Sequence, residues 1–367
     1  MPRPVEPDAA PSGAGFVHTF LPGRVVFGAG SLEQVATEVE ALGVRRALVV
    51  ATNSARAAAD VVEAQLGDLF AGRIDGVAQH VPTEVAENAR IKAREAGADA
   101  VIAIGGGSAI GLAKAIALST QRVLIVAVPT TYAGSEMTPV WGETTAGRKS
   151  TGTDLRVLPR VVVYDPVLSR GLPLKVTTAS VANAIAHCVE AVWTPKADPI
   201  TELTAVEGLR ALSHGLRDVL LAPDDLDARS NLLYGACLAG SALATAGTGL
   251  HHKLCHLLGG TYNLPHAETH AAVLPQVVRV NAFSVPQAKT RLEAALGTTD
   301  LATTDLAGGL FDLFQAAEVP TSLRELGLTE AQVAEAAAAF KPTDNPIPVT
   351  EDLVREILTR AWSGTRP

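Results

Sequence analysis

Three consecutive glycines followed by a serine, residues 105–108, are the part of the chain best suited to bind phosphate. They follow the apolar run 100–104, which is typical of a buried strand, and precede an apolar helical pattern that Ser108 is expected to cap. Glycine lets the backbone approach a ligand closely, and free N–H groups at a helix start attract negative charge. Gly105, Gly106, Gly107 and Ser108 are therefore candidate phosphate ligands. The segment matches neither the G-x-G-x-x-G nor the P-loop pattern, so a purely structural turn is the alternative.

A second candidate segment, residues 129–136, follows the next apolar run and is dense in hydroxyl groups. Its candidate ligands are Thr130, Thr131 and Ser135, and Tyr132 is included as a candidate catalytic residue. Ligands of α/β sheets bind beyond the carboxyl ends of the strands, so both segments should face one crevice and bind a dinucleotide. Ordinary turn chemistry is the alternative for this segment taken alone.

An earlier strand ends at Thr52 and Asn53, which we add to the candidate cofactor ligands. No acidic residue stands there to bind a ribose 2′-hydroxyl, so the sequence does not favour NAD over NADP. Either NADH or NADPH is expected as the cofactor.

Histidines are concentrated in the second half of the chain. Six of the nine are His187, His251, His252, His256, His266 and His270. His252 and His256 are four residues apart, and so share one helix face, which is also a spacing that suits Zn²⁺ or Fe²⁺. The carboxylate that usually completes such a site is missing, because the neutral Asn183 stands one turn before His187. On the same predicted helix, Asn183, His187 and Glu190 lie opposite an apolar stripe, and this polar stripe should be solvated or line a cleft.

The elements that must position these residues follow from the apolar pattern. Strands are predicted over residues 25–27, 47–50, 100–104, 123–128 and 161–164, and helices over 176–193, 199–221, 230–258 and 270–283. This pattern predicts a flexible tail (1–15), a dinucleotide-binding α/β domain with a doubly wound parallel sheet (16–170) and an α-helical catalytic domain (171–367). The uncharged stretch 230–250 has the length of a membrane span, but its polar residues and glycines favour a buried helix.

Composition excludes several classes of protein. With 367 residues, 47% hydrophobic and 19% charged, the chain is neither a disulfide-stapled mini-domain nor disordered. A net charge of -8 provides no general attraction for nucleic acid or an anionic membrane. Three cysteines and the absence of a signal-like start predict a cytoplasmic protein.

Together these residues resemble the iron-containing, group III alcohol dehydrogenase family, and within it the maleylacetate reductase branch. The resemblance covers nearly the whole chain after residue 15 and rests on residues 105–108, 129–136, 149, 183–187, 251–266 and 344–346. It implies a Rossmann-like domain followed by an all-α domain, a homodimer, and Lys149 as a further cofactor ligand. In the metal-dependent branch the ligands would fall at Asn183, His187, His252 and His266, with His256 beside the nicotinamide. That branch has aspartate at position 183, whereas asparagine is usual in maleylacetate reductases, so no metal is expected.

The implied activity is reduction of the conjugated C=C bond of maleylacetate to 3-oxoadipate in the degradation of aromatic compounds, with chlorinated maleylacetates left open as substrates. Hydride addition to this bond produces an enolate, in which the negative charge is delocalised onto the ketone oxygen. Hydrogen-bond donors can stabilise this charge without a Lewis acid. The candidate catalytic residues are His256, His252, His187, His266 and Tyr132. Protonated histidines would also complement the dianionic substrate. The alternatives are a metal-dependent alcohol or polyol dehydrogenase and a non-catalytic nucleotide-binding relative.

Overall fold

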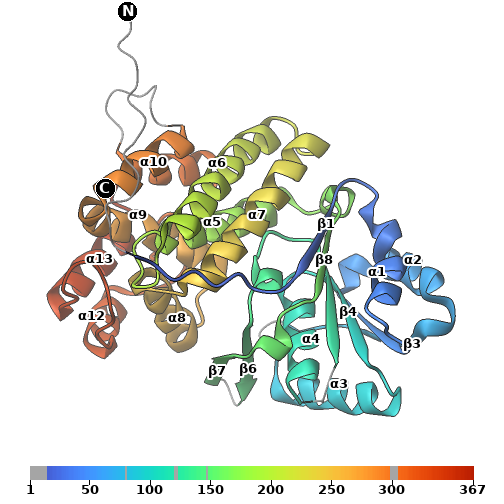
Figure 1. Cartoon of the computed structure of the whole chain (residues 1–367). Coiled ribbons are helices and arrows are strands. Elements are labelled where there is room, and N and C mark those ends of the chain that lie inside the picture. The colour runs from blue at the N-terminus through green and yellow to red at the C-terminus, as the bar shows by residue number, and fades with distance from the viewer. Residues whose placement is uncertain (1–14, 79–80, 120–122, 146–147, 298–304) are drawn as a thin grey trace, which may run out of the picture.

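A parallel sheet forms the centre of the first half of the chain (Figure 1). The computed structural model describes residues 15–78, 81–119, 123–145, 148–297 and 305–367. The sheet has the order β1-β8-β5-β4-β2-β3 and contains β1 (Arg24–Phe27), β2 (Ala47–Ala51), β3 (Phe70–Asp75), β4 (Ala100–Gly105), β5 (Leu124–Pro129) and β8 (Val161–Tyr164). All five predicted strands are confirmed. The sequence missed β3, because this half-exposed edge strand has no continuous apolar run.

Helices cover both faces of this sheet. They are α1 (Val35–Ala41), α2 (Arg56–Leu66), α3 (Thr83–Glu95) and α4 (Gly107–Ser119). Alternate residues of β4 enter different cores: Val101 packs with residues of α3 and α4, whereas Ile102 packs with residues of α1 and α2. The sheet is therefore doubly wound, as predicted. A separate antiparallel hairpin, β6 (Val140–Thr145) and β7 (Arg148–Thr153), was not predicted, because its residues are mostly polar.

The second half of the described chain is helical. It contains α5 (Leu174–Ala191), α6 (Pro199–Leu221), α7 (Leu226–Ala246), α8 (Leu250–Tyr262), α9 (His266–Asn281), α10 (Pro286–Leu296), α11 (Leu306–Ala316), α12 (Glu330–Ala339) and α13 (Glu351–Ser363). The prediction of one helix over 230–258 was wrong, because Gly247 adopts a left-handed φ of 73° and separates α7 from α8. The fold class, an α/β domain followed by a helical domain, is confirmed.

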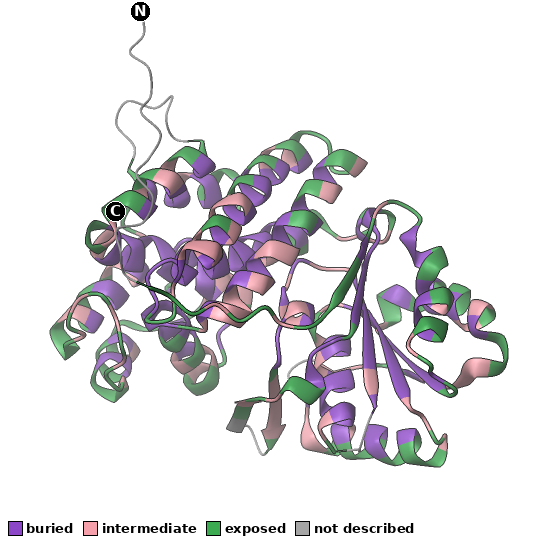
Figure 2. Ribbon diagram, viewed as in Figure 1, coloured by how far each residue is buried: buried purple, intermediate pink, exposed green. Residues whose placement is uncertain are grey.

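Helix α5 lies at the centre of the helical half and packs against α6, α7 and α9 (Figures 1 and 2). Its polar residues Asn183, His187 and Glu190 are buried along with its apolar residues. The polar stripe is therefore not solvated, and the hydrogen-bond partners of its side chains must come from other segments of the protein. This stripe forms part of the candidate site described below.

Within the described residues, no single helix has the length and apolar character needed to cross a membrane. The pair α7 and α8 passes that test only when taken together, and the two helices are bent by 99°. The domain bounds 16–170 and 171–367 remain our proposal, and the predicted tail lies almost wholly outside the described residues.

Candidate active site

The candidate cofactor loops meet at the carboxyl edge of the sheet. The N–H of Thr52, after β2, donates to the carbonyl of Ile104 (3.2 Å), and the N–H of Thr130, after β5, donates to the carbonyl of Gly105 (3.0 Å). A Cβ added to Gly105, whose φ is 146°, would lie 2.7 Å from Cγ2 of Thr52. The three loops are therefore in close contact at one edge of the sheet, where the sequence places the cofactor, and dinucleotide binding there stays a prediction.

Helix α4 begins at Gly107, directly at this edge. Its N–H groups at Ala109 and Ile110 already donate to the carbonyl of Gly106. The N–H groups of Gly107 and Ser108 belong to the first turn, where an α-helix offers no internal acceptor. They can therefore donate hydrogen bonds to a bound anion. The prediction that Ser108 caps this helix was wrong, since Ser108 is the second helical residue.

The remaining predicted cofactor ligands lie around this helix start. A Cβ on Gly106 would lie 3.0 Å from Cγ2 of Thr131, which places that threonine against the glycine segment. Asn53 is exposed and begins the short 3-10 helix η2 (Asn53–Ala55) after β2. The backbone of Lys149 pairs with Thr144 in the hairpin, but its side chain lies outside the part of the chain that the structure describes.

Lys114 anchors the hydroxyl-rich segment and was not predicted. Its buried Nζ, on α4, donates to the carbonyls of Ser135 (2.7 Å), Thr138 (2.8 Å) and Val140 (2.7 Å). Burial lowers the pKa of Lys114 to about 7, while the buried Glu136 opposes this shift. Three carbonyl acceptors match the three N–H donors of an ammonium group. One lysine within an otherwise apolar helical pattern was the sequence signal that could have identified it.

We expect Lys114→Met to lower the free energy of unfolding by about 3 kcal/mol and to weaken dinucleotide binding, because buried carbonyls lose their donor. Thermal or urea unfolding, with dinucleotide titration by fluorescence, measures both effects. Lys92→Met is the control, because Lys92 is exposed on α3. Equal stability of the two variants would contradict this role for Lys114.

The hydroxyl-rich segment also reaches the helical half. The N–H of Tyr132 donates to Oγ of Ser180 on α5 (3.0 Å). A Cβ on Gly134 would lie 3.4 Å from Nδ1 of His187, so the loop after β5 lies beside the histidines. The site is therefore formed where the sheet edge meets α5.

The structure does not support a catalytic role for Tyr132. Its side chain is fully buried in the core, and its hydroxyl accepts a hydrogen bond from Nη1 of the buried Arg229 (3.1 Å). The same guanidinium donates to Oγ1 of Thr177 on α5 (2.8 Å). Tyr132 is thus a structural contact between the loop and the helical half, and the sequence pattern gave no sign of Arg229 as its partner.

The predicted histidines form one connected cluster. The rings of His187 and His252 stack at 5.0 Å between centroids, and His252 lies 6.2 Å from His256. His256 in turn lies 6.1 Å from His266. His256 and His266 are exposed, whereas His187 and His252 are buried, so the cluster runs from the surface into the protein.

The buried histidines cannot all be charged. Burial, reinforced by the neighbouring imidazoles, holds the pKa of His187 and of His270 well below the usual value, and burial lowers the pKa of His251 to about 3. His187 is therefore not one of the protonated histidines that could complement a dianionic substrate. Near neutral pH it is a neutral hydrogen-bonding group.

Asn183 and three of these histidines carry buried polar atoms that lack a hydrogen-bond partner among the described residues: Oδ1 of Asn183, Nδ1 of His187, Nε2 of His252 and Nε2 of His270. Such atoms are costly unless a ligand or water contacts them. Asn183, His187 and His252 occupy positions at which the resemblance places the ligands of the metal-dependent branch, but an amide and imidazoles supply no negative charge to a divalent cation. The only described His, Cys and acidic side chains close enough to share an ion are His251, Cys255 and His270. The donor set at Asn183 therefore does not fit the iron of the metal-dependent branch of the family.

The group formed by His251, Cys255 and His270 is linked by its own contacts, and Nε2 of His270 is left without a partner among the described residues. Nε2 of His251 and Nδ1 of His270 share a hydrogen bond of 2.8 Å. Burial raises the pKa of the Cys255 thiol well above its usual value, so the thiolate needed for metal binding is disfavoured. This group supports the cluster from within the core.

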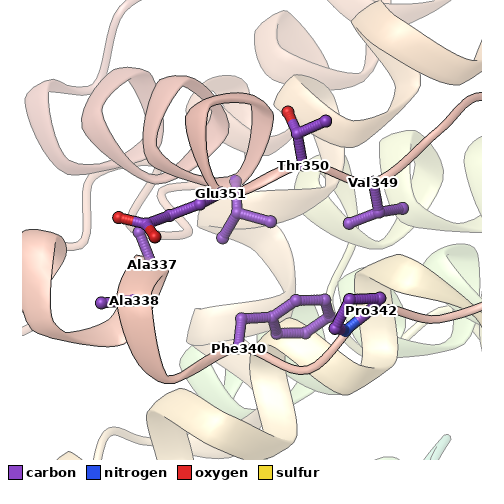
Figure 3. A pocket seen from close by; sticks show the side chains of 8 residues that line it. Ala337, Ala338, Phe340, Pro342, Val349, Thr350 and Glu351 are labelled. Atoms are coloured by element: carbon purple, nitrogen blue, oxygen red, sulfur yellow. The ribbon is translucent and has the colours of Figure 1, made fainter.

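A pocket of about 120 Å³ lies elsewhere, between α12 and α13 (Figure 3). Phe340, Pro342, Val349 and Thr350 are among the residues that line it. It contains none of the predicted site residues, so the candidate site rests on the sheet edge and the histidine cluster.

Comparison with known proteins identifies the family of this chain. Residues 22–166 match the family model described as iron-containing alcohol dehydrogenase, and residues 177–362 match that of the C-terminal part of the same family. The chain therefore belongs to the iron-containing alcohol dehydrogenase family.

Within this family the chain is similar to maleylacetate reductases. It is 46% identical over 346 residues to maleylacetate reductase from Burkholderia cepacia, covering 94% of this chain and 97% of the relative. Maleylacetate reductase 1 from Rhodococcus opacus is 45% identical, with 96% and 98% of the two chains covered. The crystal structure of maleylacetate reductase from Agrobacterium tumefaciens superimposes with a TM-score of 0.91 at 42% identity, covering 97% and 100%.

Proposed function

We propose that this protein is an oxidoreductase that reduces the conjugated C=C bond of maleylacetate to 3-oxoadipate with NADH or NADPH. The observation that carries the proposal is the histidine cluster beside the cofactor edge, with Asn183 where a metal-binding relative needs a carboxylate. The similarity to maleylacetate reductases over nearly the whole chain supports the same substrate.

The chemistry of the site suits this reaction. When bound, the reduced nicotinamide supplies a hydride to the carbon β to the ketone. Charge then develops on the ketone oxygen as an enolate, and a donor from the cluster stabilises it. His256, exposed on α8 between His252 and His266, is the residue we assign to that oxygen and to the proton that completes the reduction.

The two alternatives predict different behaviour. A metal-dependent alcohol or polyol dehydrogenase would reduce an isolated carbonyl, since a Lewis acid stabilises an alkoxide by several kcal/mol. A non-catalytic relative would bind dinucleotide without turnover. Oxidation of NADH or NADPH is therefore followed by absorbance with maleylacetate and, separately, with simple aldehydes. We expect turnover with maleylacetate only. Turnover with aldehydes only, or none with either, would overturn the proposal in favour of the corresponding alternative.

We also expect activity without a bound metal. Elemental analysis of the purified protein should find no stoichiometric Fe or Zn, and chelation should leave maleylacetate reduction unchanged, because Asn183 contributes no charge. Asn183→Asp should raise the affinity for Fe²⁺ or Zn²⁺ in a calorimetric titration. About one ion per chain in the unaltered protein, with activity lost on chelation and restored by metal, would contradict this.

The assembly and cellular setting that we propose are a homodimer in the cytoplasm, acting on a small dianionic substrate without nucleic acid or membrane. The edge strand β1 supports the proposal of a dimer. Its side chains Val25 and Phe27 are exposed, and an edge strand with exposed apolar residues can pack against a second chain. A role in degrading aromatic compounds follows from the proposed substrate.

A further inference from the structure

Glu190, near the end of α5, binds the start of another helix. Its side chain is only 1% exposed. Oε2 accepts the N–H of Gly249 (2.9 Å), and Oε1 accepts the N–H of His251 (2.6 Å). Helix α8 begins at Leu250, and its N-cap residue, Gly249, has no side chain to cap it. Glu190 therefore caps α8 from outside the helix.

The same carboxylate holds a histidine of the cluster. Oε2 of Glu190 lies 2.5 Å from Nδ1 of His252, and both side chains are almost fully buried. Both oxygens of Glu190 accept backbone N–H groups, as an ionised carboxylate does. An ionised carboxylate can only accept hydrogen bonds, so Nδ1 of His252 donates the proton of this contact.

This contact determines which nitrogen of His252 faces the site. With Nδ1 engaged by Glu190, Nε2 is the nitrogen left for a ligand, and it is one of the buried atoms without a partner among the described residues. The ring is also fixed by stacking on His187 at 5.0 Å. A buried side chain held at both its ring face and one nitrogen cannot rotate freely.

We propose that Glu190 is a positioning residue: it fixes the orientation and tautomer of His252, so that Nε2 is presented to the substrate. This inference rests on the proposed function for its kinetic consequence, but not for its structural one. Glu190 does not touch substrate itself. It couples the start of α8, which carries His252 and His256, to α5, which carries Asn183 and His187.

Glu190→Gln is the sharpest kinetic test. The glutamine amide keeps one oxygen, which can still accept the N–H of His251, whereas its NH₂ group takes the place of the oxygen that accepts from Gly249 and His252. That NH₂ group would donate to Nδ1 and so favour the opposite tautomer of His252. We expect kcat for maleylacetate to fall about 10²-fold or more, with dinucleotide affinity within a few-fold of the unaltered protein. Glu38→Gln is the control, because Glu38 is also buried and hydrogen-bonded, to Arg24 on the far side of the sheet domain.

A spectroscopic test determines the tautomer of His252 without relying on turnover. In protein labelled with ¹⁵N-histidine, the resonances of His252, assigned by comparison with His252→Gln, should show a protonated Nδ1 in the unaltered protein. Glu190→Gln should move that proton to Nε2. An unprotonated Nδ1 in the unaltered protein, or kcat unchanged in a folded Glu190→Gln variant, would overturn the inference. If maleylacetate were not reduced at all, the proposed function would fail while the nitrogen resonances would still decide the role of Glu190.

Discussion

Replacing His256 by asparagine should lower kcat for maleylacetate reduction by about 10²-fold or more, the usual scale for an acid–base or oxyanion group. Asparagine keeps a donor and roughly the size of the ring but cannot deliver a proton near neutral pH. The imidazole of His256 is exposed at the outer end of the cluster, with His252 on one side and His266 on the other. Dinucleotide affinity and melting temperature should stay near those of the unaltered protein, because His256 is not part of the core.

His214→Asn provides the matched control, since His214 is also exposed on a helix, α6, but lies outside the cluster. Steady-state kinetics of both variants separate a catalytic from a structural histidine. If kcat of His256→Asn stays within a few-fold of the control, His256 is not catalytic and His252 becomes the leading candidate.

The second large effect is expected at the candidate phosphate-binding segment, residues 105–108. Gly106→Val should weaken dinucleotide binding by about 10²-fold or more, as expected when charge-assisted hydrogen bonds to a phosphate are lost. A Cβ there would already lie 3.0 Å from Cγ2 of Thr131, and the two branches of valine would occupy the space beside the first turn of α4. The core strands are not involved, so the circular dichroism spectrum should be retained.

Gly171→Val tests whether any valine in place of glycine has this effect. Gly171 has no atom within 4 Å of an added Cβ and lies outside the cofactor edge. Fluorescence titration with NADH and NADPH compares the two variants. Unaltered affinity for NADH and NADPH in a folded Gly106→Val protein would exclude residues 105–108 as the phosphate-binding segment. A variant that loses its fold before it loses dinucleotide binding would favour a purely structural turn.

The sequence predicted the sheet well because its central strands are continuous apolar runs, which only a doubly covered parallel sheet accommodates. The edge strand β3 and the hairpin of β6 and β7 were missed because exposed strands carry mixed residues. The break between α7 and α8 depends on the left-handed backbone of Gly247, and glycine alone does not reveal whether a helix continues through it.

The site was predictable where spacing within one segment carried the information. The glycine segment 105–108 and the histidine-rich segment 251–270 are of this kind, and the structure places the loop after β5 beside the first segment and beside His187, which stacks on a histidine of the second. Contacts between distant segments were not predictable: Glu190 reaches His252, and Arg229 reaches Tyr132, across long stretches of chain. The helix pattern also did not reveal burial: the polar stripe of Asn183, His187 and Glu190 was expected to be solvated or to line a cleft, and all three residues are buried.

The central claim is that hydride is added to the C=C bond and not to the ketone. The direct measurement uses reduced nicotinamide carrying deuterium at the transferred position, with maleylacetate as substrate and the product analysed by NMR and mass spectrometry. The account predicts 3-oxoadipate with its ketone intact and one deuterium on the carbon β to it. A product with deuterium on a carbinol carbon and the C=C bond retained would contradict the account.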